Sequence, residues 1–199
     1  MYNKEQLEKA LLFLGKRLEI DGASPLNLFV CGGAALIIGE LISRHTTKDV
    51  DVVAVGYSGT DGKLEIKSSK PLPEILKKAA QQVARDLGMD ESWLNPDPAD
   101  LMKFGLPDSF MQRVETRVYS KVLTVCFLGR YDQIHLKVYA AVDQGPGKHL
   151  NDLLELKPTK EEMESAARWA MQHDTSEGFK IVLKDMLQKI GYESVANRV

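Results

Sequence analysis

A pair of glycines lies between two short apolar runs, and this arrangement constrains the fold more than any other feature of the chain. Residues 26–31 (LNLFVC) and 50–55 (VDVVAV) are short and apolar, which is typical of buried strands. Gly32 and Gly33 end the first run, and residues 34–41 then predict a short helix. This order of strand, glycine turn, helix and strand predicts a sheet covered by helices.

Two aspartates stand at the start of the second run, where the neighbouring valines favour burial. Side chains alternate along a strand, so Asp49 and Asp51 share one face, whereas Val50 and Val52 point to the other. Two carboxylates in one small space repel each other unless a cation lies between them. Mg²⁺ and Mn²⁺ prefer such hard oxygen ligands and take further ligands from phosphates. We therefore expect a divalent metal site at Asp49 and Asp51.

The glycine pair supplies a second part of the same site. Gly32 and Gly33 follow a strand and open a helix, so their backbone N–H groups and the helix dipole can hold phosphate oxygens. A glycine pair alone is most often a tight turn, and an isolated D-x-D is most often solvated. Their combination in one strand–helix–strand unit predicts a nucleoside triphosphate (NTP) site with a divalent cation, the apparatus of nucleotidyl or phosphoryl transfer.

The rest of the chain passes from mixed elements to helices. Helical periodicity or a capping pattern predicts further helices at residues 4–18, 72–87, 132–142, 150–156, 159–171 and 176–190. A loop or hairpin is expected at 56–70, an irregular connection at 89–108 and a hairpin of strands at 113–119 and 122–128. We expect an α+β fold with α/β-like alternation. Its core would span residues 1–156, and residues 157–199 would form a helical extension packed on that core.

Composition excludes several classes of protein. The chain has 199 residues, of which 44% are hydrophobic and 27% charged, so it can bury a core. A formal net charge of -2 gives no basic field for general DNA or RNA binding. Cys31 and Cys126 lack metal-ligand spacing, and no apolar run approaches the roughly 18 residues of a membrane span. We expect a cytoplasmic protein with reduced thiols and no membrane segment.

The glycine turn and the aspartates resemble a known signature. A G-G turn, a short helix and a strand with D-h-D, where h is hydrophobic, look like the nucleotidyltransferase superfamily with the DNA-polymerase-beta-like fold. An arginine and a threonine often precede the aspartates in bacterial members. The matching residues are Gly32, Gly33, Arg44, Thr47, Asp49 and Asp51. The resemblance implies a polymerase-beta-like core with a short mixed sheet and a helical C-terminal segment.

A later segment narrows the resemblance to one bacterial branch. The runs DQIHLKVYAA and KHLNDL are similar to a helical motif of proteins related to AbiEii-type toxins of toxin–antitoxin systems. The matching residues are Asp132, Lys137, Ala140, Lys148, Asp152 and Leu153. With both motifs, the resemblance covers most of residues 25–156.

The resemblance implies an activity and a set of residue roles. The activity is transfer of a nucleoside monophosphate from an NTP to a hydroxyl on RNA, protein or a small molecule, with Mg²⁺ or Mn²⁺ as cofactor. Asp49 and Asp51 would be catalytic metal ligands. The nucleotide would be held by Gly32, Gly33, Arg44, Thr47 and Lys137. An antitoxin is the protein partner that the toxin-related branch implies.

Two departures from the family pattern leave the activity open. Members normally carry a third carboxylate on a neighbouring strand, but residues 122–128 contain no acid. Glu115 is the first catalytic candidate for this role and Asp97 the second, although Glu115 also suits a surface salt bridge with a lysine such as Lys121. His149 stands where the second motif has an aspartate. The chain is predicted to be a nucleotidyltransferase, with two alternatives: a degenerate pseudoenzyme that binds nucleotide or a partner, and a toxin.

Overall fold

The chain forms two compact units in a computed structural model that describes residues 1–59 and 63–199. Helices make up 52% of the chain and strands 17%, so the class is α+β, as the sequence predicts. The first unit comprises Met1–Met102 with Val114–Leu128, and the second comprises Lys103–Arg113 with Gly129–Val199. The sequence-based boundary at residue 156 differs from this division, because the helices within residues 129–156 pack against helices that follow them.

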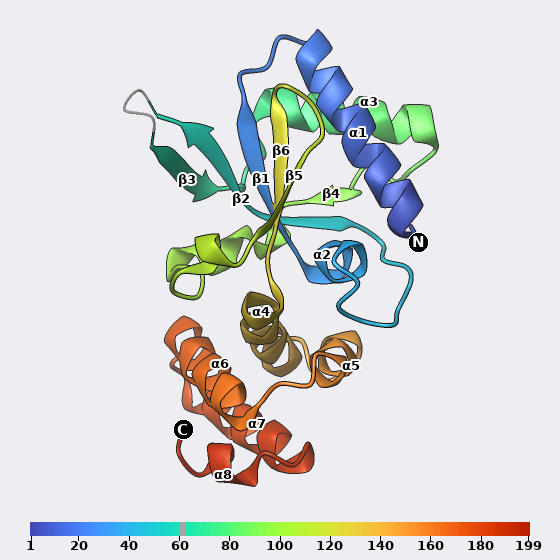
Figure 1. Ribbon diagram of the computed structural model, residues 1–199. Coiled ribbons are helices and arrows are strands. Elements are labelled where there is room, and N and C mark those ends of the chain that lie inside the picture. The colour runs from blue at the N-terminus through green and yellow to red at the C-terminus, as the bar shows by residue number, and fades with distance from the viewer. Residues whose placement is uncertain (60–62) are drawn as a thin grey trace. The chain divides into compact units, whose positions relative to one another are not determined.

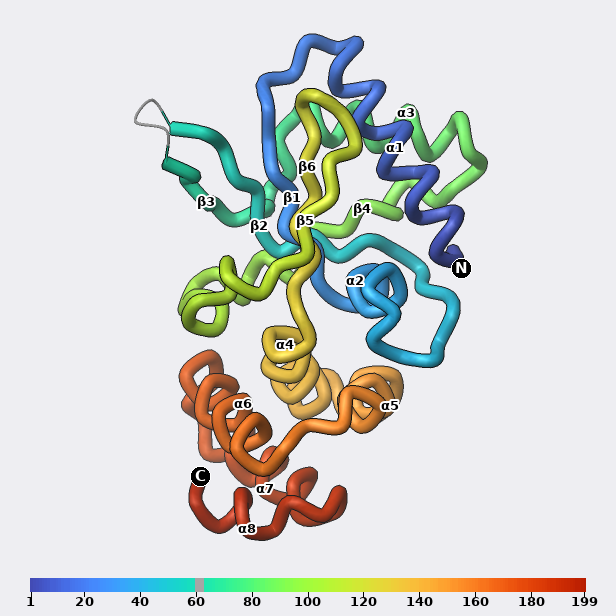
Figure 2. Tube along the Cα trace, in the orientation of Figure 1, coloured from blue at the N-terminus to red at the C-terminus, as the bar shows by residue number. Residues whose placement is uncertain are grey.

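The first unit is a small mixed sheet with helices (Figures 1 and 2). Its elements are α1 (Lys4–Ile20), β1 (Leu26–Cys31), α2 (Gly32–Ile38), β2 (Val50–Ser58), β3 (Leu64–Ser68), α3 (Glu74–Leu87), β4 (Leu94–Asn95), η1 (Asp97–Lys103), β5 (Glu115–Val118) and β6 (Leu123–Phe127). Among the described residues the strand order is β3-β2-β1-β6-β5, and β4 pairs in parallel with β2. Strand β1 runs antiparallel to β2 and parallel to β6. The sheet is therefore mixed.

The hairpin expected at 113–128 is present, and the segment expected as a loop or hairpin at 56–70 contributes a strand pair. Strands β2 and β3 pair antiparallel, as do β5 and β6. Residues 60–62, at the centre of the expected loop or hairpin at 56–70, lie outside the described residues. The connection at 89–108, expected to be irregular, contains the two-residue strand β4 and the 3-10 helix η1.

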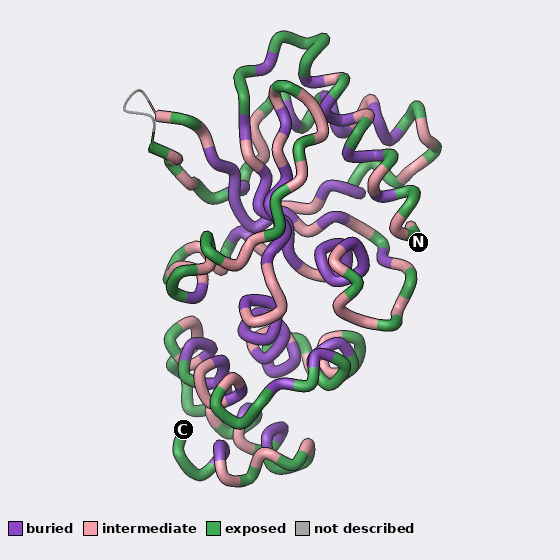
Figure 3. The backbone as a smooth tube through the Cα atoms, viewed as in Figure 1, coloured by how far each residue is buried: buried purple, intermediate pink, exposed green. Residues whose placement is uncertain are grey.

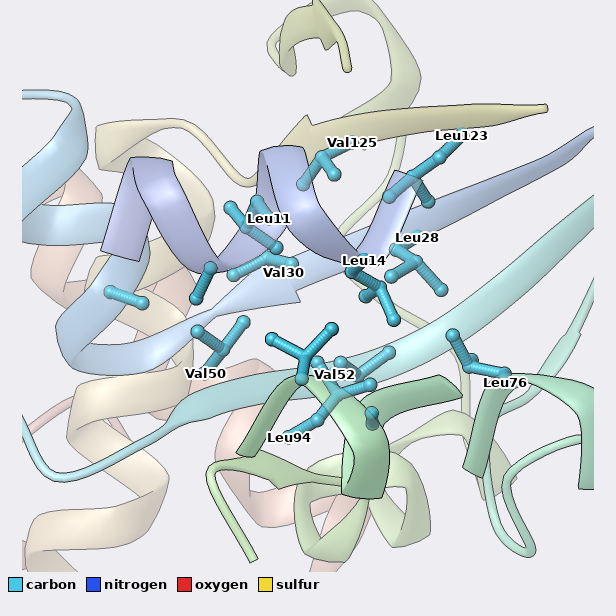
Figure 4. Close-up of a cluster of buried hydrophobic side chains, with 14 of the residues drawn as sticks. Leu11, Leu14, Leu28, Val30, Val50, Val52, Leu76, Leu94, Leu123 and Val125 are labelled. Atoms are coloured by element: carbon cyan, nitrogen blue, oxygen red, sulfur yellow. The ribbon is translucent and has the colours of Figure 1, made fainter. Parts of the chain in front are cut away.

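Helices α1 and α3 enclose the core of the first unit with one face of the sheet. A capping box of Asn3 and Gln6 begins α1, and Gly88 ends α3 in the left-handed conformation that favours glycine. Leu11 and Leu14 of α1 point toward strand side chains such as Val30 (Figure 4). Buried and exposed residues alternate along α1 (Figure 3), and its buried residues include Leu11 and Leu14. Burial of each such leucine stabilises the fold by about 1.5–3 kcal/mol.

A β-bulge determines which side chains of β2 face this core. The pairing register of β1 with β2 shifts between Phe29 and Val30, so that β2 carries one extra residue. Val50, Val52 and Val55 all lie in the core cluster, although strict alternation would turn Val55 away. Because Val50 and Val52 point into the core, the intervening Asp51 points to the opposite face of the sheet.

The second unit is helical. Its elements are η2 (Phe110–Gln112), α4 (Arg130–Asp143), α5 (Lys148–Glu155), α6 (Lys160–His173), α7 (Glu177–Lys189) and α8 (Glu193–Ala196). Helix α4 packs against α5, α6 and α7, so it is the centre of this unit. The predicted capping box of Thr159 and Glu162 is confirmed at the start of α6, with hydrogen bonds of 2.8 and 3.2 Å.

No helix within residues 1–59 and 63–199 combines the length and the apolar character that crossing a bilayer requires.

Candidate functional site

The first glycine of the motif lies directly against the second aspartate. Cys31, the last residue of β1, pairs with Asp51 on β2, and Gly32 follows with a φ of +66°. A Cβ atom at Gly32 would lie 2.2 Å from Oδ2 of Asp51. Only glycine allows both the positive φ and this approach. The turn after β1 and the aspartate on β2 are therefore one structural feature.

The second glycine lies against the threonine and arginine of the motif. A Cβ atom at Gly33 would lie 2.4 Å from Oγ1 of Thr47 and 3.1 Å from Nη2 of Arg44. Thr47 is only 6% exposed, and its backbone is fixed by a bridge to Tyr2, with N–O distances of 2.6 and 3.0 Å. The segment between α2 and β2 thus folds back onto the glycine turn.

These contacts revise the expected reason for the glycines. From the sequence, the glycines were expected to hold phosphates through their backbone N–H groups. In the structure, a side chain at either glycine would first meet Asp51 or Thr47 of the chain itself. The glycines allow the motif to assemble, and the cluster of Gly32, Gly33, Arg44, Thr47 and Asp51 is named here the glycine–aspartate cluster.

Asp49 belongs to the same edge of the sheet. It immediately precedes Val50, the first residue of β2, and is half-buried. Val50 and Val52 face the core, so Asp51 between them faces the opposite side of the sheet. Asp49 is the residue next to this strand, and a face shared by the two carboxylates stays a prediction from the sequence.

An amide, which the sequence analysis missed, lies beside Asp51. Asn95 of β4 pairs with Asp51 and donates from Nδ2 to Oδ1 of Asp51 at 2.9 Å. The side-chain oxygen Oδ1 of Asn95 accepts a hydrogen bond from the backbone N–H of Asp97 at 3.0 Å, which fixes the orientation of the side-chain amide. The neighbouring strand therefore presents a hydrogen-bond donor to the aspartate, in place of a third carboxylate. A two-residue strand has no periodicity by which the sequence could reveal it.

Asp97, the second candidate for the missing acid, interacts with a lysine. Its carboxylate lies 3.5 Å from Nζ of Lys70 and is 77% exposed. Lys70 also lies 3.2 Å from Asp100, and the hydrogen bond to Asp100 raises the pKa of Lys70. Lys70 follows Ser69, whose buried hydroxyl donates to the carbonyl of Val52 at 2.6 Å. The ammonium group of Lys70, just after the end of β3, thus lies beside Asp97, and this contact was not predicted from the sequence.

Glu115 does not lie beside the aspartates. It begins the edge strand β5, and β6 and β1 separate β5 from β2. Neighbouring strands are about 4.8 Å apart, which places Glu115 about 14 Å across the sheet from β2. Its Oε1 accepts from Nε of Arg117 at 2.8 Å. The structure therefore does not bring Glu115 next to the two aspartates, and its ion-pair partner is Arg117 instead of Lys121.

Lys137 forms a buried ion pair in the second unit. Its Nζ lies 2.7 Å from Oδ2 of Asp152, and the two side chains are 5% and 4% exposed. Asp132, from the same motif, is fully buried and binds Arg113 at 2.6 Å. Three residues matched to the second family motif thus have structural partners in the second unit. Lys137 was expected to bind phosphate from the family resemblance, but in the structure its charge has a protein partner.

His149 departs from the family motif and forms a local contact. Its Nε2 lies 3.0 Å from the side-chain oxygen of Gln144, just before α5. Within the described part of the chain, no group of three or more histidine, cysteine, aspartate or glutamate side chains is arranged to hold a metal. Any cation at the cluster would depend on Asp49 and Asp51 together with ligand oxygens.

Comparison of the chain with protein-family models, with curated proteins and with solved structures gave no match. The resemblance to nucleotidyltransferases stays a prediction from the two motifs.

Proposed function

We propose that the glycine–aspartate cluster binds a nucleoside triphosphate with a divalent cation, on a degenerate core of the polymerase-beta-like nucleotidyltransferase type. The observation that supports this proposal most is the approach of Gly32 to Asp51, with a Cβ position 2.2 Å from the carboxylate. Residues far apart in the sequence thereby form one turn with an acidic side chain and a guanidinium group. A chain that needed only a tight turn would not require an aspartate there.

The two carboxylates suit a divalent cation that is also bound by the phosphates of the nucleotide. Asp49 and Asp51 would offer two carboxylates on one face of β2, and Mg²⁺ binds to proteins through one or two carboxylates plus phosphate oxygens and water. Bound there, the cation would neutralise the charge of both carboxylates and of the phosphates. Asn95 would hold Asp51 in position through its 2.9 Å hydrogen bond. Arg44 would donate to phosphate oxygens, for which a guanidinium group is well suited.

Binding without transfer is the function proposed. Nucleotidyl transfer needs a group that accepts the proton of the attacking hydroxyl, and the neighbouring strand offers the Asn95 amide at that place. Glu115 lies on the far edge of the sheet, and Asp97 is exposed beside Lys70. The alternative of a toxin with an antitoxin partner has no structural observation in its favour, so it is not part of the proposal.

Calorimetric titration with each of the four common NTPs, with Mg²⁺ and with EDTA, tests the proposal. We expect binding that requires Mg²⁺ and is lost in Asp51→Asn, which keeps the shape of the side chain but removes its charge. Asp86→Asn is the matched control, because Asp86 lies on α3 of the same unit and accepts from Gln82. Equal affinities of the parent and Asp51→Asn would exclude this site. Release of pyrophosphate with total RNA or cell extract as acceptor would show that the chain is a transferase.

A further inference from the structure

The second unit contains a pocket that the proposed function does not use. Its volume is about 490 Å³, and its lining residues come from the segment Lys103–Arg113, from α4 and from α6. Small-molecule sites typically have volumes of about 300–1,000 Å³. All lining residues belong to the second unit, so the pocket is a property of that unit alone.

Aromatic rings from three elements line the pocket. Tyr131 comes from α4, Trp169 from α6 and Phe104 from the segment before η2. The ring of His135 lies between those of Tyr131 and Trp169, at centroid distances of 4.4 and 5.8 Å. Phe104 is 63% exposed, with its ring edge-on to His173. An exposed phenylalanine at a pocket is a surface on which a planar ligand can stack.

Arg113 lines the pocket in a fixed orientation. Its Nε lies 3.1 and 3.2 Å from the two carboxylate oxygens of Asp132, and its Nη2 bonds Asp132 and the carbonyl of Asp108. The guanidinium carbon lies 4.7 Å from the ring centroid of Tyr131. Among the described residues, the hydrogen bonds of Arg113 use Nε and Nη2 only. Nη1 is thus available to a ligand on a side chain that is already immobilised, which lowers the entropic cost of binding.

Arg168 provides a second guanidinium group in the pocket lining. Its Nε and Nη2 bind Glu164 at 3.3 and 2.9 Å, and Nη2 also donates to the carbonyl of Arg198 at 3.1 Å. Again Nη1 takes part in none of its hydrogen bonds to the described residues. Asp108, the acid in the lining, is exposed. The two arginines and this aspartate give the lining a formal charge of +1 when His135 is neutral.

Tyr131, His135 and Ser165 of the lining form a hydrogen-bonded network. Nδ1 of His135 lies 2.8 Å from the backbone carbonyl of Tyr131 and donates to it, so Nε2 accepts from the hydroxyl of Ser165 at 3.1 Å. The Tyr131 hydroxyl then donates to Oγ of Ser165 at 2.8 Å. Burial lowers the pKa of His135, which favours the neutral ring. Because this network is internally paired and His135 is not a cation in it, the cationic donors of the lining are its two arginines, beside the uncharged Ser109 and Gln172.

We propose that this pocket binds a small planar aromatic anion, a ring that bears one carboxylate or phosphate group. The ring stacks against Phe104 and Trp169, and the anionic group accepts from Nη1 of Arg168 and of Arg113. The exposed Asp108 repels additional negative charge, which favours a compact anion over a polyphosphate. The proposal is independent of nucleotide binding at the glycine–aspartate cluster, because the residues of that cluster belong to the first unit.

Titration of the full chain with benzoate, phenyl phosphate and the neutral analogue benzamide tests this proposal without any nucleotide. We expect at least one anion to bind about tenfold more tightly than benzamide, since both partners of the hydrogen bond are then ionised and the anionic group can accept two bonds, whereas the benzamide oxygen is neutral. The better of the two anions identifies the carboxylate or the phosphate as the recognised group. Absence of binding by both anions at millimolar concentration would overturn the proposal.

Two variants with matched controls locate the site. Arg168→Gln should reduce the affinity for the anion to that for benzamide. Arg198→Gln should not, although Arg198 binds the same Glu164 at 2.8 Å, because it does not line the pocket. Phe104→Ala should weaken all probes severalfold, whereas Ile181→Ala, at a site 66% exposed on α7, should weaken none. Equal effects within each pair would exclude this pocket as the binding site.

Discussion

Gly32 and Asp51 approach each other so closely that a single added carbon at Gly32 would lie 2.2 Å from the carboxylate oxygen. Gly88 has nearly the same φ, +64° against +66°, but a Cβ there would meet no atom within 4 Å. Comparing substitutions at the two glycines therefore distinguishes the free-energy cost of a left-handed backbone from the cost of the contact with Asp51.

We predict that Gly32→Ala destabilises the chain more than Gly88→Ala does. The left-handed conformation costs about 1–2 kcal/mol in both variants, and the contact with Asp51 adds about 1–3 kcal/mol at Gly32 only. In an Asp51→Ala background most of this addition should disappear, because the nearest carboxylate atoms are then absent. Urea unfolding of the parent, Gly32→Ala, Asp51→Ala and the double variant measures this cycle, and Gly88→Ala is measured beside it. An equal cost of Gly32→Ala in both backgrounds would show that the contact is unimportant.

The buried pair of Lys137 and Asp152 gives a second prediction. Lys137→Met or Asp152→Leu alone leaves one charge buried, which should cost about 3–5 kcal/mol of unfolding free energy. The double variant should cost clearly less than the sum, because no charge then stays behind. Lys189→Met is the control, since the Lys189–Asp185 pair is exposed and should contribute below about 1 kcal/mol. A negligible cost of Lys137→Met without nucleotide would instead favour the ligand-binding role that the sequence suggested.

The free energy of unfolding of the second unit should decrease as the pH is lowered, because of His135. Burial lowers the pKa of His135 in the folded state below the ordinary 6.5, although Asp132 and Glu162 oppose the shift. Below about pH 6.5 the unfolded chain takes up a proton that the folded chain does not, so the free energy of unfolding decreases as the pH falls toward the folded pKa. This contribution is fully present above pH 6.5.

His135→Gln should remove part of that pH dependence, because glutamine does not titrate. Urea unfolding at pH 7.5 and at successively lower values, about half a unit apart, compares the slopes of the two proteins. The slope below about pH 6.5 should be smaller in the variant. Identical slopes would mean that His135 is protonated equally in the folded and unfolded chains.

The sequence predicted local features well and the neighbours of a strand poorly. The apolar runs at β1 and β2 and the glycine turn were recognisable, because burial and backbone conformation act on adjacent residues. The burial of Val50 and Val52 also followed from alternation. The position of Glu115 could not be predicted in this way. It depends on the order of the strands in the sheet, whereas alternation tells only which face of a strand a side chain occupies. Asn95 was missed for the same reason, since its proximity to Asp51 exists only through tertiary pairing.

The ion pair of the second motif shows a different limit. Lys137 and Asp152 are on different helices, and a resemblance to a motif gave a role to the lysine without its partner. Neither periodicity nor charge pattern relates residues across a helix break. A buried lysine needs an anion, but an acidic side chain and a phosphate satisfy that need equally.

The amide of Asn95 provides the most direct test of the missing carboxylate. Asn95→Asp places an acid of the same shape beside Asp51, and its oxygen can still accept the backbone N–H of Asp97. Without a divalent cation this variant should be less stable than the parent, because the two carboxylates repel each other and one of them takes up a proton. With Mn²⁺ or Mg²⁺ the repulsion becomes attraction to the cation. We therefore predict a larger metal-dependent rise in melting temperature for Asn95→Asp than for the parent.

The size of the rise follows from mass action. A cation at about 100 times its dissociation constant stabilises the folded chain by about 2.7 kcal/mol, and each kcal/mol raises the melting temperature by about 2–4 °C in a protein of this size. Asn95→Ala is the control, because it removes the hydrogen bond to Asp51 without adding a ligand, so it should show no greater response to metal than the parent. Thermal melts of the three proteins over a Mn²⁺ series compare these responses. If Asn95→Asp responds no more strongly than Asn95→Ala, the face of the sheet at Asp51 is not a place where this chain can hold a cation.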